Sequence, residues 1–310
     1  MQVFSNLNDV QLSSGTAVTI GKFDGVHIGH IEILRQLCEV ATARNLIPTV
    51  VTFDRQPAAV VNPESVPHDL TGLNHRLDLL AQAGVAATVV LPFSPELAAL
   101  SPEEFVQTVL VKALNAHAIL VGKDFRFGAH AVGDVELLAQ LGQKHGFDVH
   151  IIDDVAPVNG VRASSSGIRS LLAEGNVAEA ATLLGRYPCV TGEVVHGAKR
   201  GRELGFPTAN LSQDSEGIIP ADGVYAGWLT DDGVRYPAAI SVGTNPTFEG
   251  VNLRTVEAFV LDETLDLYGH TVTVEFVGHI RGMVAFAGIE PLIEQMHEDV
   301  VITRRILEEA

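Results

Sequence analysis

The order of local patterns along the chain limits its fold more than any single motif does. Up to about residue 185, short apolar and β-branched segments alternate with segments of helical periodicity. Such alternation predicts a parallel, doubly wound sheet with helices on both faces. After Arg186-Tyr187-Pro188, short strands separated by turn signals follow one another, which predicts an antiparallel barrel. We therefore expect an α/β domain over 1–185 and a β domain over 186–310 that closes with a helix at 291–307.

In the first part we expect strands at 17–20, 48–53, 87–93, 117–121 and 148–152. The helices expected there lie at 31–43, 74–83, 102–114, 134–145, 166–173 and 177–184. In the second part we expect strands at 189–195, 223–230, 236–242, 255–261 and 271–277. Parallel sheets bind ligands at the edge where the carboxyl ends of their strands meet. The loops at 21–24, 53–57 and 122–128 each follow a strand, so we expect all three at that edge.

Composition excludes several classes of protein. A net charge of −18 over 310 residues argues against a nucleic-acid binder, which needs a basic face. No apolar run approaches the roughly 18 residues that span a membrane, and the first ten residues lack the pattern of a signal peptide. Cys38 and Cys189 lie far apart in apolar surroundings, so we expect free thiols. We expect a cytoplasmic protein with small-molecule partners and neither nucleic acid nor membrane; the oligomeric state is not indicated.

The few cations are unevenly placed. Eight of the 20 Lys and Arg residues fall in four glycine- or serine-rich stretches: Lys22, Lys123, Arg126, Arg162, Arg169, Lys199, Arg200 and Arg202. The plainer interpretation is that loops carry charged side chains because they are exposed to solvent. The alternative is that an acidic chain keeps local positive potential for anionic ligands, of which phosphates are the obvious class.

The segment from Gly21 to His30 links the first expected strand to the first expected helix. A strand, a glycine turn and a helix start place backbone N–H groups and the positive end of a helix dipole where an anion can bind. His27 and His30, on either side of Gly29, add donors for phosphate oxygens. Leu34, Leu37, Cys38 and Ala41 follow at the spacing of a helix packed on a sheet.

A second anion-binding pattern is Arg162-Ala163-Ser164-Ser165-Ser166-Gly167-Ile168-Arg169. Its serines would cap a helix, and a capped helix start flanked by arginines also suits phosphate. Together with His27 and His30 it resembles the nucleotidylyltransferase superfamily. The stretch Gly122-Lys123-Asp124-Phe125-Arg126-Phe127-Gly128, followed by Gly133-Asp134, resembles more narrowly the FAD synthetase half of bacterial bifunctional riboflavin kinase/FAD synthetase.

The second half of the chain resembles the riboflavin kinase half of the same family. Its signature is similar to Gly205-Phe206-Pro207-Thr208-Ala209-Asn210, preceded by the cationic, glycine-rich stretch 197–202. Segments 220–225, 243–248 and 256–259 resemble the family in the same order. The resemblance covers nearly the whole chain. It implies an N-terminal Rossmann-like nucleotidylyltransferase domain and a C-terminal riboflavin-kinase barrel, with ATP, riboflavin, FMN, FAD and Mg²⁺ as ligands.

The resemblance and the residue types together give the candidate site. Catalysis is assigned to Glu257, His27, His30 and Arg169. ATP and its phosphates are assigned to Gly21, Lys22, Phe23, Asp24, Gly25, Gly29, Arg162, Ser164, Ser165, Ser166, Lys199, Gly201, Gly205, Thr208 and Asn210. Flavins are assigned to Phe53, Pro57, Asp124, Phe125, Arg126 and Arg281. Mg²⁺ keeps most of its waters and phosphate ligands, so Thr208 and Asn210 suffice for it.

The chemistry of the two halves differs. Transfer of a phosphoryl group to the riboflavin hydroxyl wants a carboxylate that takes the proton, and Glu257 lies on an expected strand. Alternation puts Glu257 on one face with Thr255 and Phe259, a face that would line a flavin pocket or, as the plainer reading, meet solvent. FMN already carries an ionised phosphate, so adenylylation needs no base, only positive charge and donors on the ATP phosphates.

Two segments depart from the family pattern. After Phe53 the family commonly has Pro-His-Pro, whereas this chain has Asp54-Arg55-Gln56-Pro57. Gln56 can donate hydrogen bonds but cannot carry a charge, which leaves its effect on FMN binding open. After Arg281 a charged pair is expected, and Met283-Val284-Ala285 stands there instead. We expect a more apolar flavin edge in the kinase site.

Three rival functions stay open at this point. Only one half could be active, most plausibly the kinase. The chain could instead be a flavin sensor or carrier without turnover, which would bind flavin and consume no ATP. A histidine-based metal protein is the third, although the 12 histidines are dispersed and His27 and His30 have no carboxylate or cysteine close by in the sequence.

Overall fold

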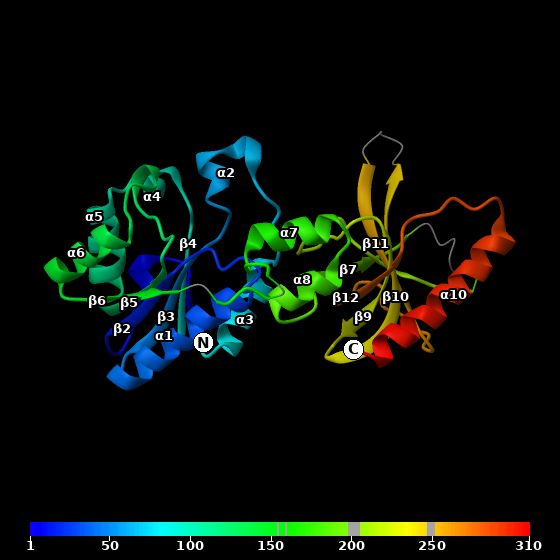
Figure 1. The fold of residues 1–310 in the computed structure, drawn as a ribbon, viewed down its shortest axis with the longest axis horizontal. Helices are drawn as coiled ribbons and strands as arrows, with labels where there is room; N and C mark the ends of the chain where they lie inside the picture. Colours follow the sequence, from blue (N-terminus) through cyan, green and yellow to red (C-terminus); the bar gives the residue numbers. More distant parts are fainter. Residues whose placement is uncertain (154, 159, 198–204, 247–251) are drawn as a thin grey trace. The chain divides into compact units, whose positions relative to one another are not determined.

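The computed structural model describes residues 1–153, 155–158, 160–197, 205–246 and 252–310 (Figure 1). It divides into two compact units, Met1–Arg162 and Ala163–Ala310. Helices α7 (Ser165–Ala173) and α8 (Val177–Leu184) therefore group with the second unit by their contacts. The sequence pattern assigned both helices to the first domain, and the boundary at 185/186 stays a prediction.

The first unit is built on one six-stranded sheet in the order β1-β4-β3-β2-β5-β6. Every neighbouring pair in it is parallel. The strands are β1 (Gln2–Phe4), β2 (Thr16–Ile20), β3 (Ile47–Phe53), β4 (Ala87–Leu91), β5 (Ala116–Gly122) and β6 (Asp148–Ile152). All residues of β2 and β4 are buried, as expected for strands covered on both faces.

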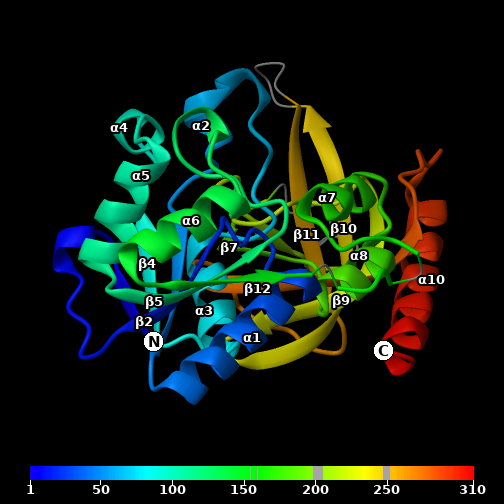
Figure 2. The ribbon, with the colours of Figure 1, turned by 60° about the vertical axis from the view of Figure 1, so that its left-hand side comes forward.

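Helices cover both faces of this sheet (Figures 1 and 2). The α-helices are α1 (Ile28–Arg44), α2 (Ala58–Val61), α3 (Leu73–Gln82), α4 (Pro95–Ala98), α5 (Pro102–Phe105) and α6 (Val135–His145). One core contains α1 and α3, through Leu34, Leu37 and Leu80. The other contains α5 and α6, through Phe105 and Leu138. The predicted doubly wound parallel sheet is confirmed.

The helix expected at 102–114 has a different form. Ser101 and Glu104 make a capping box at its start. After Phe105 the chain continues as a π-helix over Val106–Ala113. Val106 and Val109 are fully buried in this wider helix. Short 3₁₀ turns lie at Leu7–Asp9, Pro63–Ser65 and Ala129–Ala131.

The second unit contains a closed barrel in the order β10-β11-β8-β7-β12-β9. Its strands are β7 (Cys189–Val195), β8 (Ala209–Leu211), β9 (Gly223–Asp231), β10 (Val234–Pro246), β11 (Asn252–Val260) and β12 (Thr271–Arg281). Their pairings are antiparallel, as predicted. Asp232 and Gly233 make the tight turn between β9 and β10, both with positive φ. The terminal helix α10 (Ile289–Glu308) packs against β9, β10 and β12.

The topology brings the predicted ligand loops of the first unit to one edge. Strands β2, β3 and β5 are neighbours in the sheet and run parallel, so the loops at 21–24, 53–57 and 122–128 leave it at the same edge. Within the described part of the chain, no helix is both long and apolar enough to cross a membrane. Cys38 and Cys189 are both in the thiol form and are not joined by a disulfide.

Candidate active sites

The turn between β2 and α1 has an unusual backbone. Phe23, Gly25 and Val26 have φ values of 51°, 81° and 38°. Only glycine adopts this left-handed region without strain, so the β-branched Val26 is held there by its surroundings. His27 lies directly before α1, and its ring stacks on that of His30 with centroids 3.7 Å apart. The two predicted histidines thus lie side by side at the start of a helix.

Asp24 anchors this turn to the segment that precedes α3. It is buried, and its Oδ1 accepts a hydrogen bond of 2.8 Å from the Leu70 N–H. The Gly25 N–H donates to the Thr71 hydroxyl at 3.3 Å. The assignment of Asp24 to ATP stays a prediction; in the structure its carboxylate holds the turn against Leu70.

Two pairs of aromatic side chains lie at or after the ends of strands β3 and β5, on either side of β2 in the sheet. Phe53, the last residue of β3, meets Phe93 edge to face, with ring centroids 5.1 Å apart. Phe125, which follows β5, stacks on Phe127 at 5.5 Å. Arg126 donates to the carbonyl of Phe125. These aromatic rings provide flat surfaces at the edge where the loops converge.

The other predicted residues of the first half are placed as follows. Pro57 lies directly before α2. Asp124 forms an exposed ion pair with Arg162, Nη2 to Oδ2 at 2.9 Å, and such pairs contribute little stability. Ser164 caps α7 by accepting from the Gly167 N–H at 3.1 Å. Ser165, Ser166 and Arg169 lie in α7, in the second unit, so their convergence with the histidines stays a prediction.

In the barrel, three predicted residues come together. The Thr208 hydroxyl donates to Glu257 Oε2 at 3.3 Å. The Asn210 amide nitrogen donates to the hydroxyl and the carbonyl of Thr208, both at 3.1 Å. Glu257 pairs with Asn210 across β11 and β8. The short strand β8, which the sequence did not predict, is what sets this register. Lys199 and Gly201 lie outside the described residues, and Gly205 has a φ of 88°.

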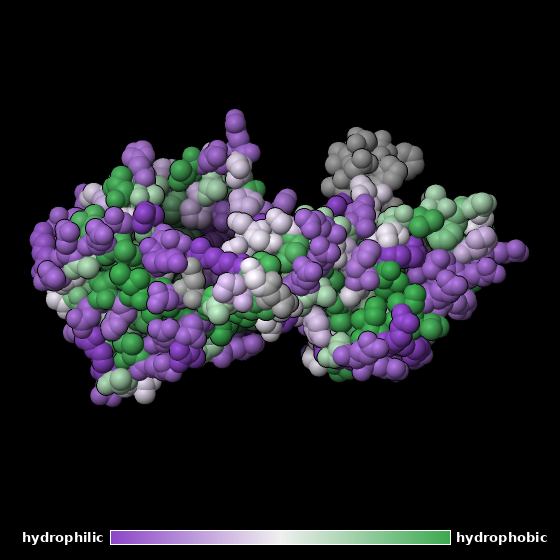
Figure 3. Space-filling view, viewed as in Figure 1, coloured by the Kyte–Doolittle hydropathy of each residue, from purple (hydrophilic) through white to green (hydrophobic). Residues whose placement is uncertain are grey.

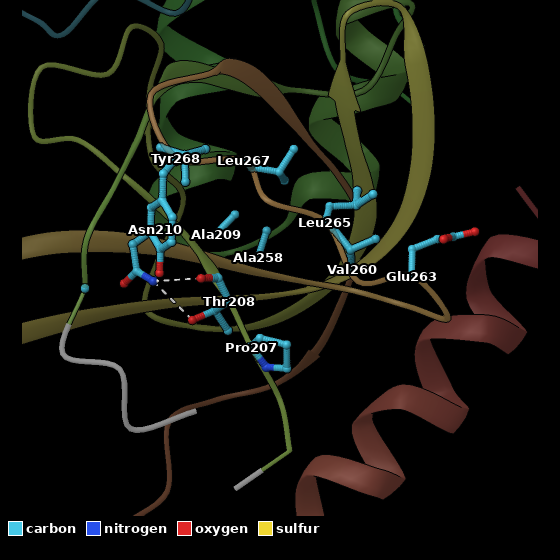
Figure 4. A pocket seen from close by; sticks show the side chains of 12 residues that line it. Pro207, Thr208, Ala209, Asn210, Ala258, Val260, Glu263, Leu265, Leu267 and Tyr268 are labelled. Carbon is cyan, nitrogen blue, oxygen red and sulfur yellow. Dashed lines mark hydrogen bonds between the residues drawn. The ribbon is translucent and has the colours of Figure 1, made fainter. Parts of the chain in front are cut away.

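Two cavities meet at Thr208. The smaller, about 60 Å³, is lined by Thr208 and Asn210 and by Glu263 and Tyr268 beyond them (Figure 4). The larger, about 290 Å³, is lined by Thr208, Glu257 and apolar side chains from the barrel and α10. Ala258 and Val260 line the first cavity, whereas Glu257 and Phe259 line the second. The alternation of β11 therefore divides the two spaces between opposite faces of one strand.

The wall of the larger cavity is largely apolar. It includes Phe206, Phe259, Met283, Val284, Phe286, Leu292, Met296 and Val300. Met283, Val284 and Ile289 are also exposed, and Figure 3 shows hydrophobic surface on this part of the second unit. The apolar segment expected after Arg281 thus borders this cavity.

Arg281 lines the cavity but is held by an ion pair. Its Nη2 lies 2.7 Å from Oδ2 of Asp299 on α10, and its Nε lies 2.9 Å from Oδ1. Asp299 is buried. The pair therefore ties the end of β12 to α10 and forms part of the cavity wall. Sequence reasoning found this terminal helix but missed Asp299, because nothing in the local pattern separates it from the exposed acids beside it.

Both halves of the chain match known protein families. The FAD synthetase family model matches residues 9–167, and the riboflavin kinase family model matches residues 184–307. The Escherichia coli K12 protein named bifunctional riboflavin kinase/FMN adenylyltransferase is 38% identical over 94% of this chain and 92% of its own. The chain belongs to the bifunctional riboflavin kinase/FMN adenylyltransferase family. The resemblance seen in the sequence is confirmed.

Further relatives extend over the same length. A protein of Pseudomonas fluorescens with the same name is 36% identical over 99% of this chain and 98% of its own. A crystal structure from Streptococcus pneumoniae, titled macrolide-efflux protein, is 34% identical and covers 97% of this chain and 98% of its own, with a TM-score of 0.90. Both units of the chain therefore occur together in these proteins.

Proposed function

We propose that this chain phosphorylates riboflavin to FMN with ATP and then adenylylates FMN with a second ATP to give FAD and pyrophosphate. The observation that carries the kinase step is that Thr208 lines both barrel cavities while its hydroxyl contacts Glu257. A nucleotide bound on one side of Thr208 and a flavin on the other would meet beside that carboxylate. The two family models, one per half, support the pairing of activities.

In the kinase step, the larger cavity receives the flavin ring. At about 290 Å³ with mostly apolar walls, it has the character of a small-molecule site. Glu257 accepts the proton of the 5′-hydroxyl while that oxygen bonds to the γ-phosphorus and the bond to ADP breaks. Serving as base requires a carboxylate beside the nucleotide-binding residues, and Glu257 is the carboxylate next to Thr208.

The same residues fit Mg²⁺. Thr208 presents a hydroxyl oxygen and Asn210 an amide oxygen, both of the hard type that Mg²⁺ prefers. The amide nitrogen of Asn210 is turned toward Thr208, so its oxygen lies on the other side, near Gly197. A Cβ at position 197 would come within 2.3 Å of that oxygen, so glycine leaves it room. Bound there, the ion would neutralise charge on the ATP phosphates.

In the adenylylation step, the phosphate of FMN attacks the α-phosphorus of ATP and pyrophosphate leaves. The start of α1 with His27 and His30 supplies dipole and ring donors to the phosphates, and Lys22 adds charge. Lys22 is mostly buried, and burial lowers its pKa, with the nearby Arg76 lowering it further. The aromatic rings of Phe53 and Phe125 are the proposed flavin platform. Arg169 is proposed to join them at the phosphates.

The setting of the enzyme follows from the same chemistry. Its partners are ATP, riboflavin and FMN, and its acidity disfavours nucleic acid. Both cysteines are in the thiol form, which suits a reducing compartment, and we propose the cytoplasm.

The test is a time course with purified protein, riboflavin, ATP and Mg²⁺, in which the flavins are separated at intervals. FMN should appear first and FAD later, and a chelator should stop both. FMN without FAD, even when FMN is the starting substrate, would leave only the kinase. Tight flavin binding without ATP consumption would instead indicate a carrier.

A further inference from the structure

Gln56 joins three loops of the first unit. Its amide nitrogen donates to Asp24 Oδ2 at 3.2 Å and also contacts Asp69 Oδ1 within hydrogen-bond distance. Asp24 belongs to the turn after β2, Gln56 to the segment after β3, and Asp69 to the segment before α3. A primary amide has two N–H donors, and here each serves one carboxylate. This is the residue whose departure from Pro-His-Pro the sequence left unexplained.

A buried arginine lies behind this bridge. Arg76 on α3 is completely shielded from solvent, and its Nη2 donates to the Phe53 carbonyl at 2.8 Å. Its Nε and Nη1 are buried and have no hydrogen-bond partner among the described residues. Burial lowers the pKa of Arg76, against the opposing attraction of Asp69, Asp24 and Asp54.

Burying such a group costs folding free energy. A buried guanidinium without full hydrogen bonding costs several kcal/mol, even when carboxylates lie nearby. An apolar side chain of similar size would fill the same space without this burial cost. The guanidinium instead fixes the carbonyl of Phe53, the last residue of β3, and offsets the charge of the two acids that Gln56 bridges. Lys22, 3.4 Å from Asp69 Oδ2, completes a cluster of two cations and two bridged acids.

We propose that Gln56 and Arg76 are positioning residues for adenylyl transfer, which hold the flavin-side segment at Phe53–Pro57 against the nucleotide-side turn at Lys22–Asp24. This inference rests on the proposed function of the first unit. Neither residue need touch substrate. The Gln56 amide sets the spacing of the two segments, and Arg76 keeps the two bridged acids from repelling one another.

The bridge needs a donor that carries no charge of its own. In a Gln56→Glu variant, a third carboxylic acid would face Asp24 and Asp69, and repulsion raises the pKa of the introduced group. While protonated, it can still donate one hydrogen bond; once ionised, it repels both neighbours. The other charged groups around it are Asp54 and Arg55 on its own segment, Lys22 on the turn after β2, and Arg76 on α3. His68 and His75 adjoin Asp69 and Arg76 in the chain.

The first experiment measures FMN adenylylation by Q56E relative to the wild type as a function of pH. We expect a loss of about tenfold near pH 8, the scale of a misplaced substrate, that shrinks as the pH falls. The matched control is Gln143→Glu, at an exposed glutamine of α6, which adds the same charge elsewhere in the unit. Riboflavin phosphorylation by the same samples should be unchanged. A Q56E rate equal to that of the control, or a ratio to wild type that does not change with pH, overturns the proposal.

The second experiment uses Arg76→Met alone and together with Asp69→Asn. Arg76 is buried and Asp69 attracts it, so removing Arg76 alone leaves an acid uncompensated, whereas removing both charges restores the balance. We expect R76M to lower the kcat of adenylylation about tenfold and the double variant to recover most of it. Loss of the kinase activity along with adenylylation would show unfolding and not positioning. A double variant no better than R76M would overturn the role assigned to charge.

The outcomes separate this inference from the proposed function. If the wild type makes FAD from FMN and Q56E behaves as its control does, only the inference fails. If the wild type makes no FAD from FMN, both fail together.

Discussion

The hydroxyl of Thr208 donates a hydrogen bond of 3.3 Å to the carboxylate of Glu257, and the same threonine lines the two cavities of the barrel. Thr208 precedes strand β8, while Glu257 lies on β11, with which β8 pairs. The contact therefore depends on barrel closure and would be lost if the register shifted by one residue. In the proposed kinase step, the phosphoryl group and the flavin hydroxyl meet at this contact.

The first prediction concerns Glu257→Gln. The amide keeps the shape and can still accept a hydrogen bond from Thr208, but it cannot take a proton. We expect riboflavin phosphorylation to fall by about 10²–10⁴-fold, the usual contribution of a general base. Adenylylation, started from FMN with the same protein, should be unchanged. Retention of wild-type kinase activity would remove Glu257 from the role of base.

The second prediction concerns His30→Ala. The ring of His30 stacks on His27 and lies 5.0 Å from that of Phe23, so alanine removes a proposed phosphate donor together with these two ring contacts. We expect adenylylation to fall by about 10²–10³-fold and phosphorylation to stay near normal. His117→Ala is the matched control, an exposed histidine near the start of β5, away from the edge where the loops converge. Equal loss of both activities would contradict separate sites.

Much of this fold was accessible from the sequence because its signals are local. The short apolar and β-branched runs of β2 and β3 predict strands from neighbouring residues alone. The face of Glu257 followed from alternation alone, and the structure places Glu257 and Phe259 in one cavity wall. The convergence of three loops followed from the rule that parallel strands end at one edge.

The parts that were missed depend on distant contacts. Strand β8 has three residues, too few for a periodic signal, and exists because β7 and β11 flank it. Arg76 reads as an ordinary residue of an amphipathic helix, and only the folded chain shows it buried against Phe53. From the sequence, Gln56 was only a residue that cannot carry the charge of the family's histidine, yet it joins acids 32 and 13 residues away. Such pairings cannot be read from spacing.

The third prediction concerns the buried Tyr225 of β9. Its hydroxyl donates to the Ala221 carbonyl at 2.6 Å, and burial raises its pKa from 10 to about 12. An acid whose pKa is higher in the folded chain stabilises that state below pH 10 and loses this contribution as the pH rises toward 12. We expect Tyr225→Phe to cost about 1 kcal/mol in the free energy of unfolding at neutral pH.

The pH dependence distinguishes this from simple loss of a contact. Between pH 10 and about 12, the free energy of unfolding of Tyr225→Phe should decline less steeply than that of the wild type. It is measured by chemical denaturation, with a spectroscopic signal that reports on the second unit. Tyr236→Phe, a partly exposed tyrosine on β10, should follow the wild-type slope. Parallel curves for all three proteins would contradict the assignment.

The fourth prediction concerns the ion pair between Arg281 and Asp299. Because Asp299 is buried and Arg281 largely so, Asp299→Ala leaves an uncompensated charge and should cost about 3–5 kcal/mol. The pair also holds the end of β12 against α10 at the wall of the larger cavity, so the KM for riboflavin should rise. The KM for FMN in adenylylation should not change.

Asp262→Ala is the control for this substitution. It breaks a solvent-exposed ion pair between Asp262 and Arg304, which lies on the same helix α10. Exposed pairs contribute at most about 1 kcal/mol, so this variant should melt close to the wild type and keep its KM for riboflavin. If both variants melted alike, burial would not be what gives the Arg281–Asp299 pair its effect. If Asp299→Ala lowered stability and left the KM for riboflavin unchanged, the cavity beside α10 would not be where the flavin binds, and the kinase site would have to lie elsewhere on the barrel.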